Sequence, residues 1–483
     1  MKITSLEVIK VPPSWVWLRI HTDTEHFGLG EPFLEGHPDT VIAEVKRLEP
    51  LLIGKDPTQV EKLWKEMYES GMGYLGGPIK LSAISGIDMA LWDLAGKAAG
   101  VPIYQMLGGR AHDRIKVYRA SGGQLPYAIE PGEPYRPGNP PQTDLATNEP
   151  ETFRESARIL VEEWGYRSLK VHIGLGTGLE VTREVDRVAE KFAAVREGAG
   201  SDIDVAIDIH NPNPAIGRQL IEALAPLRPL FIEEPMPVER VDALARIIEG
   251  TTATIAAGER WMGKWIFFDA LSSGLLAVVQ PDISHAGVIT ETKKIAVLAE
   301  ASYAKLAIHC PLSPMAFAAS IQVDACSTNF LVQEHNEVND TRRNDGKTLI
   351  GEGFFNDPYV LDDDGCVAVP VGPGLGIEID PEGFEKVMAK PWSTVRGEEL
   401  YAITHFWVDY EIGIATPIVP IGRVTKRGRR SSQSNDSARI TISLMSDAQS
   451  PTPTFDGKSR DFASCAELCK GRTRFVETNF RKQ

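Results

Sequence analysis

Cysteine is scarce in this sequence, with five residues among 483. Secreted domains that depend on disulfides are dense in cysteine, so this composition argues against a disulfide framework. Cys465 and Cys469 lie four residues apart, but no second pair of ligands stands near them, which disfavours a zinc site. We therefore expect a reduced intracellular environment, the cytoplasm.

Long apolar runs and a basic excess are also absent. No apolar run reaches the length that spans a bilayer, and residues 1–20 lack the uninterrupted apolar core and cleavage site of a signal peptide. With 51 Lys and Arg against 66 Asp and Glu, the net charge is −15, which argues against a nucleic-acid partner. We expect no membrane and no nucleic acid as partners. A small anionic substrate remains compatible, because one bound cation can reverse the local field.

The N-terminal part, residues 1–112, reads as a mixed α/β unit. Residues 3–11 and 15–20 alternate as strands do, and residues 39–54 and 57–68 have helical spacing. A long stretch at 79–109 is small and apolar on one face. We expect these residues to form a domain of their own.

From residue 113 to 340, short β-prone runs alternate with helical stretches. Such alternation implies parallel strands, and eight units favour a closed (β/α)₈ barrel, with an open doubly wound sheet as the alternative. The eight runs are residues 115–120, 168–173, 204–208, 230–234, 254–259, 276–282, 305–310 and 330–334.

Three further segments surround this pattern. Residues 122–150 are rich in Pro, Gly and Asn and are predicted to form a loop. Residues 341–395 have the turns of hairpins and are expected to return to the N-terminal unit. Residues 396–483 are rich in Ser, Thr and Arg and are predicted to be a disordered tail, with an error in the gene model as an alternative. The basic run KRGRR within the tail is interpreted as solvated rather than as a nuclear signal.

Acidic residues follow successive strands of the predicted barrel. Asp208, Glu233 and Glu259 are about 25 residues apart, one for each strand. The carboxyl ends of barrel strands meet at one mouth, where three carboxylates would repel one another unless a cation sat among them. Hard oxygen donors suit Mg²⁺. The sequence therefore predicts a magnesium site at these residues.

Histidines at the same strand ends predict proton transfer. His309 ends the seventh run and Asp282 the sixth, so the carboxylate can hold the far nitrogen of the imidazole, as a general base requires. His210 lies two residues after Asp208 and is expected on the same strand and the same face. We interpret His285 as structural, and Glu234 as a salt-bridge partner that points away from the barrel axis.

Several motifs keep the order and spacing of a known family. They are AISGIDMALWDLAGKAAGVPIYQMLGG at 83–109, LFIEEP, AGER, VVQPDISHAGVITE and AIHCPLSP. Together they resemble the mandelate racemase group of the enolase superfamily, and its D-galactonate dehydratase branch in particular, over residues 1–395. The resemblance implies an α+β capping domain over a modified (β/α)₈ barrel, Mg²⁺ as cofactor, and a homo-oligomer.

The resemblance also implies roles for the residues. It places the metal on the three carboxylates named above, makes His309 the base with Asp282 behind it, and makes His210 the acid that protonates a departing 3-hydroxyl. Glu334 would hydrogen-bond the enolate, which requires a raised pKa. The expected reaction removes the C2 proton and the 3-hydroxyl of an aldonate, D-galactonate first, to give a 2-keto-3-deoxy acid.

The sequence departs from the family pattern at the second strand. Racemase relatives carry Lys-x-Lys there, whereas this chain has Lys170, Val171 and His172, which weakens a racemase reading. We interpret His172 as structural, with a substrate contact or a secondary acid/base as the alternative. The loop DIHNPNPAIG leaves the stereochemical preference open. The glycines of residues 21–36 are expected to act as hinges of a loop that excludes water. Dehydration of another aldonate such as gluconate, a racemase or epimerase, and an inactive binding or scaffold protein remain the alternatives.

Overall fold

The computed structural model describes residues 1–121, 149–173, 181–272, 274, 276–336, 340–343 and 345–392. The described residues all lie in one compact unit, Met1–Ala415. The predicted loop at 122–150 falls almost entirely outside them, and so does the predicted tail at 396–483 with its basic run and its two cysteines.

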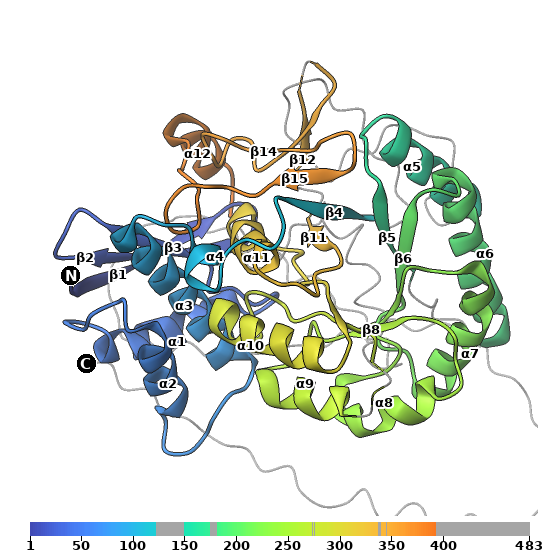
Figure 1. Ribbon diagram of the computed structural model, residues 1–483, viewed down its shortest axis with the longest axis horizontal. Helices are drawn as coiled ribbons and strands as arrows, with labels where there is room; N and C mark the ends of the chain where they lie inside the picture. The colour runs from blue at the N-terminus through green and yellow to red at the C-terminus, as the bar shows by residue number, and fades with distance from the viewer. Residues whose placement is uncertain are drawn as a thin grey trace, which may run out of the picture. The chain divides into compact units, whose positions relative to one another are not determined.

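The N-terminal part forms a three-stranded antiparallel sheet packed on helices (Figure 1). The sheet order follows the chain: β1 (Ile3–Val11), β2 (Trp15–Thr22) and β3 (Phe27–Gly30). The helices are α1 (Pro38–Leu48), α2 (Val60–Glu69), α3 (Pro78–Ala99) and the single turn α4 (Ile103–Met106). Apolar residues of α1 and α2 recur at helical spacing and are buried with α3 in one core. We refer to this part as the cap.

The glycines of β3 have a packing role that the sequence did not predict, and the hinge role of the segment 21–36 stays a prediction. A Cβ on Gly28 would lie 2.1 Å from the carbonyl oxygen of Ala90, and one on Gly30 would lie 2.0 Å from that of Gly86. Both glycines therefore allow β3 to lie directly on the backbone of α3. They fix the chain that leads into residues 31–36.

Strands of the second part form a closed parallel barrel, which confirms the predicted fold. Among the described residues the order is β10-β9-β8-β7-β6-β5-β4-β11, and a parallel bridge between Leu306 and Phe330 closes the ring. The strands are β4 (Arg114–Ser121), β5 (Ser168–His172), β6 (Asp204–Asp208), β7 (Ile232–Glu233), β8 (Ile255–Ala257), β9 (Val278–Val279), β10 (Lys305–Leu306) and β11 (Gln333–His335).

Helices surround the barrel, as Figure 1 shows in green and yellow. They are α5 (Pro150–Glu162), α6 (Val181–Ala199), α7 (Pro214–Leu224), α8 (Val241–Ile248), α9 (Lys264–Leu271), α10 (Val288–Ala301) and α11 (Pro314–Ala325). Tyr118 and Phe231 fill the interior with small residues from other strands, so the barrel is a packed core and its chemistry is confined to the mouth.

The chain then returns toward the cap. Its elements are β12 (Asp340–Arg342), β13 (Thr348–Ile350), β14 (Tyr359–Val360), β15 (Cys366–Ala368) and α12 (Pro381–Met388). β15 pairs antiparallel with β4 of the barrel, whereas Phe384 stacks on Trp17 and the indole of Trp392 donates to the carbonyl of Trp15 at 2.8 Å. The domain boundaries at 112, 340 and 395 stay a prediction.

Cap carboxylates hold the N-termini of two barrel helices. Both oxygens of Asp88 accept hydrogen bonds from Thr290, in the first turn of α10, at 2.6 and 3.1 Å. Glu31 accepts from the hydroxyl of Ser313 and from the backbone of Ala316, at the start of α11. Acceptors at these positions satisfy the free N–H groups of a helix N-terminus. The cap is therefore fixed on the barrel by specific polar contacts.

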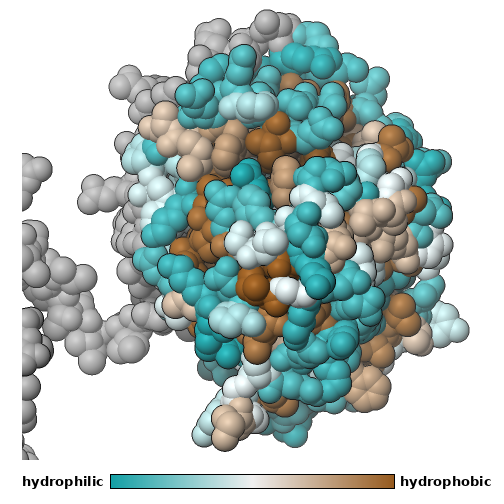
Figure 2. Space-filling model, turned by 90° about the vertical axis from the view of Figure 1, so that its left-hand side faces the viewer, coloured by the Kyte–Doolittle hydropathy of each residue, from teal (hydrophilic) through white to brown (hydrophobic). Residues whose placement is uncertain are grey.

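Seen from the side of the cap, the surface mixes polar and apolar residues without a uniform belt of either kind (Figure 2). None of the helices among the described residues has the length and hydropathy that a membrane span requires.

Candidate active site at the mouth of the barrel

Three carboxylates meet where successive strands end. Asp208 is the last residue of β6 and pairs in register with Glu233, the last residue of β7, while Glu259 follows β8 by two residues. One ligand atom from each of the three lies within 4.8 Å of the others. All three side chains are buried. The structure thus brings together the residues that were predicted to hold a cation.

Two oxygen atoms of this cluster lack hydrogen bonds within the part of the chain that the structure describes. Among the described residues, the Oε2 atoms of Glu233 and Glu259 are buried without a hydrogen-bond partner. Burial, together with repulsion from Asp208 and Glu233, raises the pKa of Glu259 well above its usual range, and burial with the same kind of repulsion raises the pKa of Glu233. Orphaned oxygens on two of three converging carboxylates fit a divalent cation with hard oxygen ligands, such as Mg²⁺.

Lys170 on β5 places a buried positive charge beside this cluster. Its ammonium group lies 2.9 Å from Oε1 of Glu233 and 2.8 Å from Oε1 of Glu334, and all three side chains are buried. Burial raises the pKa of Glu334, but the charges of Lys170 and His309 outweigh it and lower this pKa. The predicted raised pKa of Glu334 is therefore wrong. The hydrogen-bond donor at this place is the lysine, which the sequence reading left without a role.

His309 and Asp282 form the predicted pair. Their strand ends are joined by a parallel bridge, and Nδ1 of His309 lies 2.7 Å from Oδ2 of Asp282. A proton on Nδ1 leaves Nε2 free to face the carboxylate cluster, 3.5 Å from Oε2 of Glu259. Burial lowers the pKa of His309, but the charges of Glu334 and Asp282 raise it overall. This arrangement suits a group that accepts a proton.

His210 lies beside Asp208, although not in the way predicted. The strand ends at Asp208, and His210 follows in a left-handed conformation with a φ of 55°. This turn brings Nδ1 to 2.9 Å from Oδ2 of Asp208, and Nη2 of Arg260 lies 3.0 Å from Nε2. The two contacts fix the tautomer, because Nδ1 donates to the carboxylate while Nε2 accepts from the guanidinium. Burial lowers the pKa of His210 to about 4.

His172 also belongs to this cluster, and its structural role stays a prediction. Its Nδ1 lies 3.1 Å from Oδ2 of Asp208, and its ring packs edge to face on His210 at 4.2 Å. His172, Asp208 and His210 are therefore a second group with the spacing of metal ligands. The guanidinium of Arg260 opposes a metal on Nδ1 of His210, because Nε2 would then carry a proton facing a cation. The oxygen cluster is the better fit.

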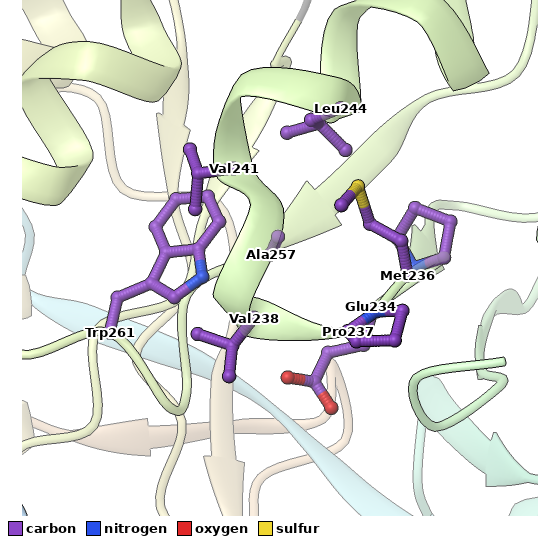
Figure 3. Close-up of a pocket in the computed structure, with 9 residues that line it drawn as sticks. Glu234, Met236, Pro237, Val238, Val241, Leu244, Ala257 and Trp261 are labelled. Atoms are coloured by element: carbon purple, nitrogen blue, oxygen red, sulfur yellow. The ribbon is translucent and has the colours of Figure 1, made fainter. Parts of the chain in front are cut away.

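Arg260 is the residue that the sequence reading missed. It forms ion pairs with Glu234 and, at 2.6 Å, with Glu259, and it reaches His210 as described above. Its position next to Glu259 in the motif AGER was the available signal. The salt-bridge role predicted for Glu234 is confirmed. Figure 3 shows its carboxylate at the edge of a small apolar pocket, on the opposite side from Leu244.

Both halves of the chain match models of one family. Residues 8–108 match the mandelate racemase/muconate lactonizing enzyme N-terminal domain, and residues 152–383 match the enolase C-terminal domain-like model. The chain belongs to this family, the mandelate racemase and muconate lactonizing group of the enolase superfamily.

Individual relatives each cover about four fifths of the chain. D-galactonate dehydratase of Variovorax paradoxus is 40% identical over 396 residues, which are 81% of this chain and 95% of that protein. D-galactonate dehydratase of Cronobacter sakazakii is 39% identical over 383 residues, which are 79% of this chain and 93% of that protein. A solved enolase superfamily member from Salmonella Typhimurium aligns with a TM-score of 0.69 at 29% identity, over 80% of this chain and 98% of that one.

Proposed function

We propose that this protein is a Mg²⁺-dependent acid-sugar dehydratase that acts on an aldonate, with D-galactonate as the first candidate. The observation that carries the proposal is the position of His309, whose Nε2 faces the carboxylate cluster while Asp282 holds Nδ1. The names of the relatives support the substrate class. At 40% identity they leave the particular sugar acid open.

Asp208, Glu233 and Glu259 would hold the cation, which would supply positive charge to the substrate carboxylate as negative charge develops on it. His309 takes the proton from C2 at Nε2. Lys170 donates a hydrogen bond where that charge develops, because its ammonium group is already fixed between Glu233 and Glu334.

His210 gives a proton to the 3-oxygen, so that water leaves as the C3–O bond breaks and the C2–C3 double bond forms. The resulting enol tautomerises to a 2-keto-3-deoxy acid. In the structure Nε2 of His210 accepts from Arg260, so the acid role requires this nitrogen to take up a proton and Arg260 to turn away from it. We expect the substrate to cause both changes.

The test is incubation of the purified full chain with Mg²⁺ and a panel of aldonates that includes D-galactonate and D-gluconate. A 2-keto-3-deoxy acid should form from at least one of them, and a chelator should stop its formation. Absence of product from every aldonate, with a folded protein, contradicts the proposal. Deuterium incorporation at C2 without a keto acid would instead identify a racemase or epimerase.

We further propose that the chain forms a homo-oligomer. Light scattering on the purified protein tests this point independently of activity.

A further inference from the structure

A buried histidine joins the cap to the residues behind His309. His285 lies in the segment between β9 and α10 and is 5% exposed. Its Nδ1 is 3.1 Å from the hydroxyl of Ser82 in α3, and its Nε2 is 3.0 Å from Oε2 of Glu35. Both of these partners belong to the cap.

The nitrogen that faces Glu35 also approaches Asp282, at the distance of an ion pair rather than of a hydrogen bond. Nε2 of His285 is 3.7 Å from Oδ1 of Asp282, and the backbone N–H of Ser284 donates to that oxygen at 2.6 Å. Oδ2 of Asp282 is bound to His309, as described above. Side chains therefore run in one line from the cap to the mouth of the barrel, in the order Glu35, His285, Asp282 and His309.

The pKa of His285 is consistent with its position beside two carboxylates. Burial lowers the pKa of His285, but Asp282 and Glu35 raise it to about 9. A cationic imidazole between two carboxylates is held by both. Asp282 is completely buried, so its orientation depends on these contacts rather than on water.

The cap residues that hold His285 are themselves fixed in place. A Cβ on Gly86 would lie 2.2 Å from the nitrogen of Pro32, so the chain leading to Glu35 packs directly on α3. Ser85 of the same helix accepts from the N–H of Gly287 at 3.2 Å, and the indole of Trp64 donates to the carbonyl of Gly287 at 3.2 Å. Seating of the cap thus places Glu35 and Ser82 against His285.

We propose that Glu35 and His285 are positioning residues, through which the seated cap orients Asp282 and, with it, Nε2 of His309. The inference rests on the proposed function in so far as His309 is taken as the base. It assigns a purpose to His285, which the sequence suggested was structural, and it makes proton abstraction dependent on the cap.

The experiment compares Glu35→Gln and His285→Asn with Ser85→Ala, a control at the same seam that lies outside the line. Relative to the wild-type enzyme, kcat should fall by about 10-fold in each of the first two variants. KM should stay within about 2-fold of the wild-type value. Ser85→Ala should keep the wild-type kcat. The double variant Glu35→Gln, His285→Asn should lose no more than His285→Asn, because the line is already broken.

A second measurement needs no activity. The low-field proton resonance of the His309–Asp282 hydrogen bond, identified by its loss in His309→Asn, should shift in Glu35→Gln and His285→Asn but not in Ser85→Ala. An unchanged resonance overturns the inference, as do a rise in KM alone, an equal loss in the control or additive losses in the double variant. If the wild type gives no product, the proposed function fails, and the resonance still tests the positioning.

Discussion

Buried carboxylates in two regions of this molecule differ in whether their oxygens accept hydrogen bonds. At the seam between the cap and the barrel, both oxygens of Asp88 accept hydrogen bonds from Thr290 at a helix N-terminus. At the mouth of the barrel, one oxygen each of Glu233 and Glu259 has no hydrogen-bond partner among the described residues. Burial of an unpaired polar atom costs about 1–3 kcal/mol, so the second arrangement is destabilising unless something else binds there. We infer that the first region stabilises the fold and that the second binds a cation.

Removal of one carboxylate from the mouth should have the largest effect. We expect Glu259→Gln to lower turnover by at least about 10³-fold, because the cation would lose a ligand. The same change should raise the stability of the metal-free protein by about 1–3 kcal/mol, because it removes a buried acid that Asp208 and Glu233 repel and that has one oxygen without a hydrogen-bond partner among the described residues. Thermal unfolding in a chelator measures this, with the exposed Glu61→Gln as control. Lower metal-free stability in Glu259→Gln would contradict the comparison.

The two histidines at the mouth should separate the two halves of the reaction. His309→Asn should abolish both product formation and deuterium exchange at C2, because the proton acceptor is gone. His210→Asn should lower dehydration by about 10²–10⁴-fold and retain the exchange. Mass spectrometry of substrate recovered from deuterium oxide distinguishes the outcomes. Loss of exchange in both variants would show that His210 does more than protonate the leaving group.

The seam should respond to pH. Burial raises the pKa of Asp88 from 3.8 to about 8, against the hydrogen bonds from Thr290 that lower it. A raised pKa means that the folded state holds a proton that the unfolded state releases, so the stability due to this group is lost as pH rises from about 4 to 8. The free energy of unfolding of Asp88→Asn should therefore match that of the wild type near pH 4. Between pH 4 and pH 8 the variant should become increasingly more stable than the wild type. If Asp88→Asn is less stable than the wild type at pH 8, the carboxylate of Asp88 is ionised at the helix end.

Asp324 on α11 tests whether a buried acid without hydrogen-bond partners is necessarily needed for activity. Both of its oxygens are buried without a hydrogen-bond partner among the described residues, but no other acid joins it in a metal-ligand group there. We expect Asp324→Asn to keep full turnover and to raise stability at neutral pH by about 1–3 kcal/mol. Denaturant unfolding checks the stability, and the keto-acid assay checks the turnover. A loss of turnover would show that an isolated buried acid is also needed for activity.

An exposed ion pair gives the smallest expected effect. Lys10 and Asp39 are 2.8 Å apart, the same distance as Lys170 and Glu334, but their side chains are 44% and 64% exposed. Water screens the exposed pair, so Asp39→Asn should change stability by less than about 0.5 kcal/mol. A larger change in denaturant unfolding would mean that distance, rather than burial, decides the strength of these pairs.

The barrel and the convergence of its acids were predictable because both depend on local sequence. An apolar strand that ends in an acid fixes where Asp208, Glu233 and Glu259 stand, and closure of the ring brings neighbouring strand ends together. The pair of His309 and Asp282 followed for the same reason. The tail and the insert after β4 lie outside the described residues, so these predictions stay untested.

Other features depended on contacts that no sequence period carries. The ion pair of Lys170 with Glu334 joins strands that are not neighbours, and it reversed the predicted pKa shift. The position of His210 comes from its own left-handed conformation after the strand, where alternation no longer applies. The packing role of the β3 glycines was not predicted, because flexibility and close packing favour the same residue type.

The most direct test of the cation site is calorimetric titration of the chelator-treated protein with Mg²⁺, in buffers of different ionisation enthalpy. We predict one ion bound per chain with release of protons, because the pKa values of Glu233 and Glu259 are raised in the metal-free state. Binding should be lost in Glu259→Gln. Absence of binding by the wild type, or equal binding by Glu259→Gln, would contradict the account.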